Sequence, residues 1–139
     1  MRYLLLLAGL VLSAFASEDP DVKVWSRIIS DIRLEEYRIY VRDPQLRRLV
    51  DRIGWIRRVD RCSEATLAIE SREYPLTGAE CASVAKLAND YRLFLRDKGA
   101  VGAFFWLKSR PTILFSAPRL RRFGLEVDEE MRQYMEDLP

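Results

Sequence analysis

Two cysteines, Cys62 and Cys81, are the residues whose type and spacing most directly suggest chemistry. Because their number is even, they can form one disulfide in an oxidising compartment; the alternative is two separately buried thiols. They do not form a CxxC motif, so a thioredoxin-like redox site is not expected. The sequence has no histidine, which excludes Ser-His-Asp and Cys-His catalysis and histidine-ligated metal centres.

No other motif indicates catalysis or a cofactor. The chain lacks a GxGxxG or Walker A string, and the turn over residues 42–45, after the first predicted strand, contains no glycine. The glycines within residues 99–102 are interpreted as the tight entry to a hairpin. Ser116 stands at a predicted strand end, but no base is available to activate it. We therefore expect a protein that is not an enzyme and that holds neither a cofactor nor a metal.

Charge patterning suggests a binding surface. The net charge of +2 is too close to neutral to favour nucleic-acid binding. Arginines concentrate between residues 42 and 61, either as a solvated helix face with local ion pairs or as a docking face for an acidic protein or anionic lipid headgroups. Residues 126–139 are acidic and could pair with this run within one molecule or between copies, so a homodimer is one candidate assembly. The candidate partner-binding residues are Arg47, Arg48, Arg52, Arg57 and Arg58.

The N-terminus indicates export. Arg2 precedes an apolar run over residues 3–11, and residues 14–16 form a small-x-small cleavage site before an acidic stretch. The sequence therefore predicts a signal peptide over residues 1–16, followed by one domain over residues 17–139 that does not span a membrane after cleavage. The alternative is an uncleaved N-terminal anchor helix.

The elements that must position these residues alternate between helices and strands. Helical spacing of apolar residues, with Asp-Pro and capping-box starts, predicts the helices. They cover residues 20–34, 43–54, 77–90 and 117–124, with a last helix capped by Asp128.

Alternating and β-branched segments predict the strands. Strands over residues 37–42, 65–70 and 91–95 should be parallel, because helices connect them, and a hairpin over 101–116 adds an antiparallel edge. A short strand is also predicted over residues 55–59. The fold class is thus α/β: a single compact domain with a mixed, mostly parallel sheet, helices on both faces and a C-terminal β-hairpin plus helix. A ligand crevice in such a fold lies at the carboxyl ends of the parallel strands.

Aromatic residues cluster at Phe104, Phe105 and Trp106. Because side chains alternate along a strand, Phe104 and Trp106 should face one way and Phe105 the other. This triplet is interpreted as core on both sides of the strand, with an exposed aromatic on the hairpin edge for partner binding as the alternative.

In the C-terminal stretch, residues 98–105 (KGAVGAFF) lead through the hairpin to residues 113–125 (ILFSAPRLRRFGL), and a polar cap then opens the last helix. This stretch resembles the end of the YfiR-like periplasmic family. Ser116 stands where the family usually has asparagine, and Asp128 stands where it usually has a serine cap. The order of a signal peptide, a helix, a strand and a cysteine before a buried strand is also similar, although the family's Trp-Pro after the first helix is absent.

This resemblance implies a non-catalytic regulator in the periplasm. The best understood members bind the periplasmic part of an inner-membrane diguanylate cyclase in c-di-GMP signalling and hold it inactive, and disulfide state influences that repression. The implied partner is therefore an inner-membrane signalling protein, with a diguanylate cyclase as the example. The alternatives are a periplasmic small-ligand-binding or sensor module and an accessory subunit of an envelope complex.

Overall fold

The computed structural model describes residues 19–139, and the signal peptide predicted over residues 1–16 lies outside them. The strands are β1 (Arg38–Val41), β2 (Arg57–Val59), β3 (Leu67–Glu70), β4 (Lys86–Ala88), β5 (Ala100–Leu107), β6 (Arg110–Ser116) and β7 (Met135–Glu136). The α-helices are α2 (Pro20–Asp31), α3 (Pro44–Asp51), α4 (Tyr91–Arg96) and α5 (Ala117–Arg122), and the short 3-10 helices are η1 (Cys62–Glu64), η2 (Ala79–Cys81) and η3 (Glu129–Tyr134).

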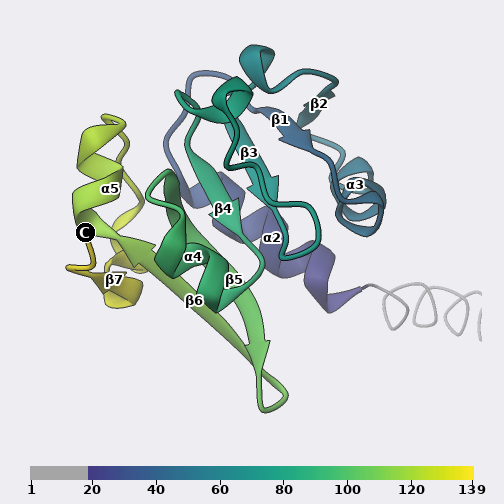
Figure 1. The fold of residues 1–139 in the computed structure, drawn as a ribbon. Helices are drawn as coiled ribbons and strands as arrows, with labels where there is room; N and C mark the ends of the chain where they lie inside the picture. Colours follow the sequence, from purple (N-terminus) through teal and green to yellow (C-terminus); the bar gives the residue numbers. More distant parts are fainter. Residues whose placement is uncertain (1–18) are drawn as a thin grey trace, which may run out of the picture.

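All seven strands belong to one sheet in the order β2-β1-β3-β4-β5-β6-β7 (Figure 1). Every neighbouring pair is parallel except β5 and β6, which form the antiparallel hairpin. The predicted α/β fold with a mixed, mostly parallel sheet is therefore confirmed.

Helices α2 and α3 begin where the sequence places them. The Asp19 carboxylate accepts a hydrogen bond from the Asp21 N–H (2.9 Å), and the Asp43 carboxylate accepts one from the Gln45 N–H (2.8 Å). Proline occupies the first turn of both helices, where its missing N–H has no intrahelical partner to lose. Each cap therefore fixes the start of its helix.

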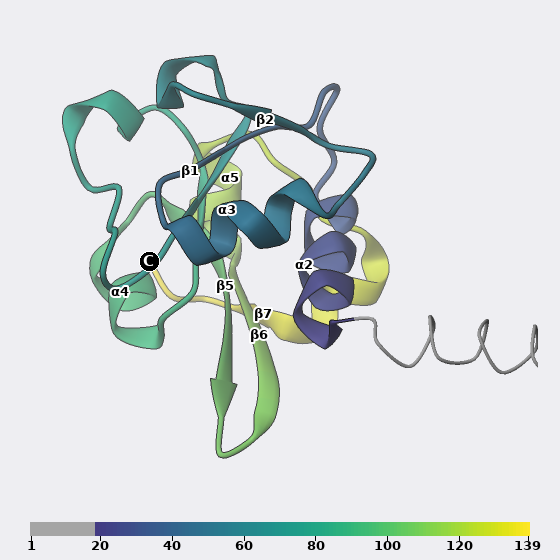
Figure 2. The same cartoon turned by 90° about the vertical axis from the view of Figure 1, so that its right-hand side faces the viewer.

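Helices cover both faces of the sheet (Figure 2). On one face, α2 and α3 bury Trp25, Ile29 and Val50 in the main core. On the other face, α4 packs Leu93 and Phe94 into a separate cluster with small residues of β4 and β5. The predicted arrangement of helices on both faces is confirmed.

The aromatic triplet divides as strand alternation requires. The Phe104 side chain is buried and meets the Trp25 ring edge-on at 5.3 Å between centroids. Trp106, on the same face but nearer the hairpin tip, is 47% exposed. The core interpretation therefore holds for Phe104, while Trp106 stays half open to solvent.

The prediction for residues 77–95 is wrong. A helix over 77–90 followed by a strand over 91–95 was expected, but the chain forms η2, then strand β4, then helix α4. Asp90 is the N-cap of α4, and its carboxylate accepts from the Leu93 N–H (2.9 Å). Strand β4 takes the central parallel position that the sequence assigned to residues 91–95.

The hairpin and the short helix after it are confirmed. Lys108 and Ser109 form a two-residue turn with positive φ (50° and 64°), which suits the right-handed twist of the flanking strands. Helix α5 follows, and the Ser116 hydroxyl accepts from the Arg119 N–H (3.2 Å) as its cap. The last predicted helix is wrong in type: the chain forms η3 after Asp128 and then β7, which pairs with β6.

The acidic C-terminal region forms ion pairs within the same molecule, with arginines of α2 and of the segment that follows it. The Arg33 side chain lies near Glu126 (3.4 Å) and Asp128 (3.2 Å), and Arg27 of α2 pairs with Glu130. A backbone hydrogen bond from Asp128 N–H to the carbonyl of Asp31 (2.8 Å) reinforces this contact. The structure thus gives these acidic residues partners outside the arginine-rich run of α3 and β2.

Candidate functional site

Cys62 and Cys81 form a disulfide, as predicted. Their Cα atoms lie 5.4 Å apart, and the bond joins η1 to η2. Both cysteines are buried in a small cluster with Leu76 and Val84. The Glu80 carboxylate accepts from the Cys62 N–H (3.3 Å), which adds a second link between the two segments.

Removing this disulfide should lower stability. We expect Cys62→Ala/Cys81→Ala to reduce the free energy of unfolding by on the order of 3 kcal/mol, because the unfolded chain regains the freedom of the closed loop. Urea denaturation of the oxidised protein and the double variant would measure this. The oxidised protein should also resist thiol alkylation until it is reduced; free alkylation of both residues in unreduced cell extract would contradict the pairing.

The structure divides the five predicted partner-binding arginines. In the parallel register of β1 and β2, Arg58 lies opposite Ile39 and Arg57 lies opposite Arg38. Since Ile39 belongs to the core beneath α2 and α3, Arg58 faces the α3 side, where its Nε lies 2.7 Å from Asp51 Oδ1. Arg57 points to the opposite face of the sheet.

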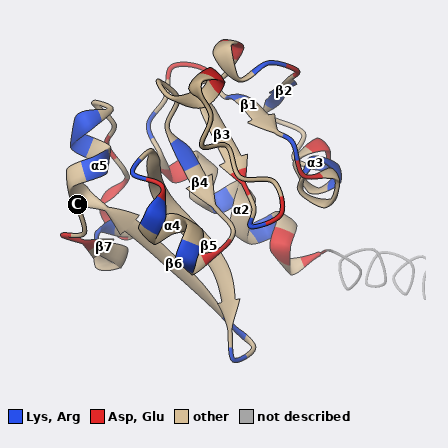
Figure 3. Cartoon of the chain, viewed as in Figure 1, with Lys and Arg blue, Asp and Glu red and all other residues tan. Residues whose placement is uncertain are grey.

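The other three arginines lie on or beside α3. Arg47 and Arg48 occupy its exposed face, and neither forms an ion pair with any residue of 19–139. Arg52 is the C-cap of this helix, and its guanidinium lies 3.5 Å from the Asp19 carboxylate. Figure 3 shows basic residues along α3 and β2. We call Arg47, Arg48, Arg52 and Trp55 the α3 surface.

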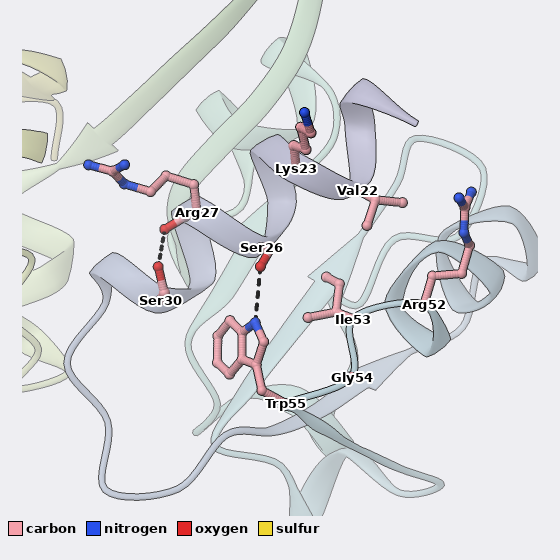
Figure 4. Close-up of a pocket in the computed structure, with 9 residues that line it drawn as sticks. All are labelled: Val22, Lys23, Ser26, Arg27, Ser30, Arg52, Ile53, Gly54 and Trp55. Carbon is pink, nitrogen blue, oxygen red and sulfur yellow. Dashed lines mark hydrogen bonds between the residues drawn. The ribbon is translucent and has the colours of Figure 1, made fainter. Parts of the chain in front are cut away.

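A hollow of about 570 Å³ lies between α2 and the segment that follows α3 (Figure 4). Trp55 lines it, 47% exposed, with its indole N–H donated to the Ser26 hydroxyl (3.0 Å) and its ring edge-on to Tyr37. The cationic side chains around it, Arg27 and Arg52 among them, point away from one another. The hollow therefore presents the edge of the Trp55 ring among cationic side chains that lie apart. These side chains do not converge to bind a single anion.

A second hollow, which the sequence did not predict, lies between α4 and the β5–β6 hairpin. Its volume is about 770 Å³, and Tyr91, Phe105, Trp106 and Leu107 are among its lining residues. We call it the hairpin groove. Its one signal in the sequence is the aromatic triplet, because the α4 residues that complete it fall in the segment predicted as a strand.

A buried cluster of charge fixes the ends of β3, β4 and α4. Lys86 Nζ lies 2.8 Å from Asp97 Oδ2 and donates to the carbonyl of Leu76 (2.8 Å), and Glu70 Oε1 accepts from the Leu76 N–H. The backbone of Gly99 packs against the Lys86 side chain, and a Cβ atom at this position would lie only 2.8 Å from that side chain. Because all three ionisable side chains are buried, we interpret the cluster as one that holds the fold together.

The protonation states of this cluster follow from its burial. Burial, and then a hydrogen bond with Asp97, raise the pKa of Glu70 to about 8. Burial alone would raise the pKa of Asp97, but hydrogen bonds from Glu70, Lys86 and the Gly99 N–H lower it below its usual value. At neutral pH the Glu70 carboxyl is therefore protonated and donates to the ionised Asp97.

Within residues 19–139, no group of three or more acidic or cysteine side chains is placed to hold a metal ion. No helix in the same part of the chain has the length and apolar character needed to cross a bilayer. In comparisons with known proteins, no protein family, no curated protein and no solved structure matches this chain. The resemblance to the YfiR-like family therefore stays a prediction.

Proposed function

We propose that this protein is a non-catalytic regulatory binding protein of the periplasm and that it docks its α3 surface onto an acidic region of a membrane signalling protein. One observation carries the proposal: Arg47 and Arg48 stand exposed on α3 with no ion pair among the described residues, and Arg52 at the end of this helix lines the same hollow as the half-exposed Trp55. Arginine and tryptophan supply most of the binding energy in many protein interfaces.

The partner class comes from the resemblance to YfiR-like repressors. It indicates an inner-membrane signalling protein, with a diguanylate cyclase as the example. The Cys62–Cys81 disulfide supports an oxidising compartment such as the periplasm. To act as a repressor, the protein must bind the inactive conformation of its partner more tightly than the active one, because equal affinity shifts no equilibrium.

The geometry favours a protein partner over a lipid surface. The Trp55 ring donates a hydrogen bond to Ser26 and contacts Tyr37 edge-on, so turning outward to insert into a bilayer would break both contacts. The surrounding cations are separated and suit individual carboxylates, because a guanidinium can bind a carboxylate through two parallel hydrogen bonds.

Charge reversal on α3 tests this proposal. The protein carrying Arg47→Glu/Arg48→Glu should capture at least about tenfold less of its membrane partner in crosslinking within cells, because two attractive contacts become repulsive. Its capture should also lose the salt sensitivity of the wild-type protein.

Arg57→Glu/Arg61→Glu is the matched control. It reverses two exposed arginines that lie outside α3 and that form no ion pair among the described residues. It should leave capture unchanged. Equal capture by both variants would eliminate the α3 surface, and salt-sensitive pelleting with anionic vesicles that lack protein would assign the surface to lipid instead.

A further inference from the structure

The hairpin groove lies where α/β folds commonly bind ligands. Arg72 follows β3, Asn89 follows β4 and Leu107 ends β5, and all three line the groove. The groove is therefore at the carboxyl ends of three parallel strands, the usual position of ligand sites in such sheets. Its volume of about 770 Å³ also lies within the range of small-molecule sites.

The floor of the groove is apolar and already formed. Phe105, Leu107 and Leu114 share one face of the hairpin, according to strand alternation and the β5–β6 register. The Tyr91 ring of α4 packs against Phe105 at 5.6 Å between centroids and remains 47% exposed. Trp106 is also among the lining residues, but its side chain faces the opposite side of the strand, where its indole N–H is held by the Asp21 carboxylate (2.9 Å).

The rim of the groove is positive. Arg72 and Arg92 line it, and neither guanidinium forms an ion pair or a hydrogen bond within residues 19–139. The one acidic side chain in the lining, Asp90, is engaged as the cap of α4 through the Leu93 N–H. The side-chain amide of Asn89 and the hydroxyl of Thr112 are also without partners among the described residues.

We propose that the hairpin groove binds a small amphipathic organic anion. The apolar part of this ligand lies against Phe105, Leu107 and Tyr91, and its carboxylate, sulfonate or phosphate group lies between Arg72 and Arg92. Charge-assisted hydrogen bonds from guanidinium groups to such an anion are among the stronger polar contacts in proteins. This site is separate from the α3 surface and does not depend on the proposed function.

Two dyes with the same ring system test the site. We would titrate the oxidised full-length protein with 8-anilinonaphthalene-1-sulfonate and with its neutral analogue N-phenyl-1-naphthylamine, following dye fluorescence. The sulfonate should bind saturably and about tenfold more tightly than the neutral dye, because it alone can accept from the arginines. Amide NMR shifts on binding should map to residues 89–92 and 105–114.

Arg72→Gln/Arg92→Gln should remove this preference while leaving the affinity for the neutral dye unchanged. Arg47→Gln/Arg48→Gln, which removes the same charge from the α3 surface, should keep the preference. The proposal is overturned if neither dye saturates, if the shifts map elsewhere, or if the preference survives Arg72→Gln/Arg92→Gln. Because partner capture through α3 is measured separately, failure of one proposal leaves the other standing.

Discussion

Replacing Arg119 by methionine should lower the free energy of unfolding by at least about 3 kcal/mol. Arg119 is completely buried, and its Nη1 donates to the carbonyls of Phe94 (2.5 Å), Asp97 (3.1 Å) and Ala100 (2.9 Å). Its guanidinium also lies over the Phe94 ring, 4.8 Å from the centroid. Methionine would fill much of the volume but would remove the guanidinium donor from all three carbonyl oxygens, of which that of Asp97 keeps the Ala100 N–H (3.0 Å).

Urea denaturation would measure this loss, and Arg121→Met is the matched control on the same helix. Because Arg121 is exposed, its replacement should change stability by less than about 0.5 kcal/mol. The loss of stability in Arg119→Lys should lie between those of Arg119→Met and Arg121→Met. An ammonium group cannot bind several carbonyls in the planar geometry of a guanidinium group. A loss in Arg119→Met no larger than in Arg121→Met would show that the buried guanidinium does not stabilise the fold.

The second large effect is a decline in stability with rising pH that is caused by Glu70. Its pKa is raised from 4.5 to about 8 in the folded protein, chiefly by burial. In the unfolded chain Glu70 loses its proton near its usual pKa, whereas in the folded protein it keeps it, so the unfolded state is favoured as pH rises. The stabilisation that comes from the protonated Glu70 is fully present below pH 4.5. Between pH 4.5 and about pH 8 it falls by about 1.4 kcal/mol per pH unit.

Glu70→Gln should remove this decline. An amide is the same shape as the protonated carboxyl, can donate to Asp97 and can accept from the Leu76 N–H, but it does not titrate. Free energies of unfolding measured at several values between pH 5 and pH 8 should therefore be flatter for Glu70→Gln than for the wild-type protein. Glu73→Gln, at a neighbouring exposed position, should retain the wild-type slope; parallel slopes for all three proteins would refute the shared proton.

At the acid end the lowered pKa of Asp97 acts in the opposite direction. Its hydrogen bonds stabilise the ionised form, so this contribution is present above the ordinary pKa of an aspartate and is lost as pH falls through the folded value. Stability in both the wild-type protein and Glu70→Gln should therefore decrease in strong acid.

Elements with local signals could be predicted from the sequence. Helices α2 and α3 have an Asp-Pro start and a regular apolar stripe, and the β5–β6 hairpin has aromatic and β-branched strands around a short turn. Strand β4 could not be predicted, because its residues also fit a helical stripe and because Lys86 is a charged residue at its start. The Asp97 carboxylate and the Leu76 carbonyl, both distant in sequence, make Lys86 suitable for the interior.

Some features of the candidate sites could likewise be predicted from the sequence, and others could not. The disulfide follows from the count and setting of the cysteines, and the arginine run is visible in the sequence. The separation of Arg57 from Arg58 depends on strand register, since a shift of one residue reverses every side chain. The hairpin groove needs residues from three separated segments, around 72, 89–92 and 105–114, which only the folded chain brings together.

The contact between α2 and the acidic residues 126–130 has a consequence for the order of assembly. The ion pair between Arg27 and Glu130 joins positions 103 residues apart, and Ile32 forms a β-bridge with Val127. Any process that delivers the chain from its N-terminus, whether a ribosome or a translocation channel, presents α2 long before residues 126–130. The contacts of α2 with these residues therefore form only after the C-terminal part of the chain has been delivered.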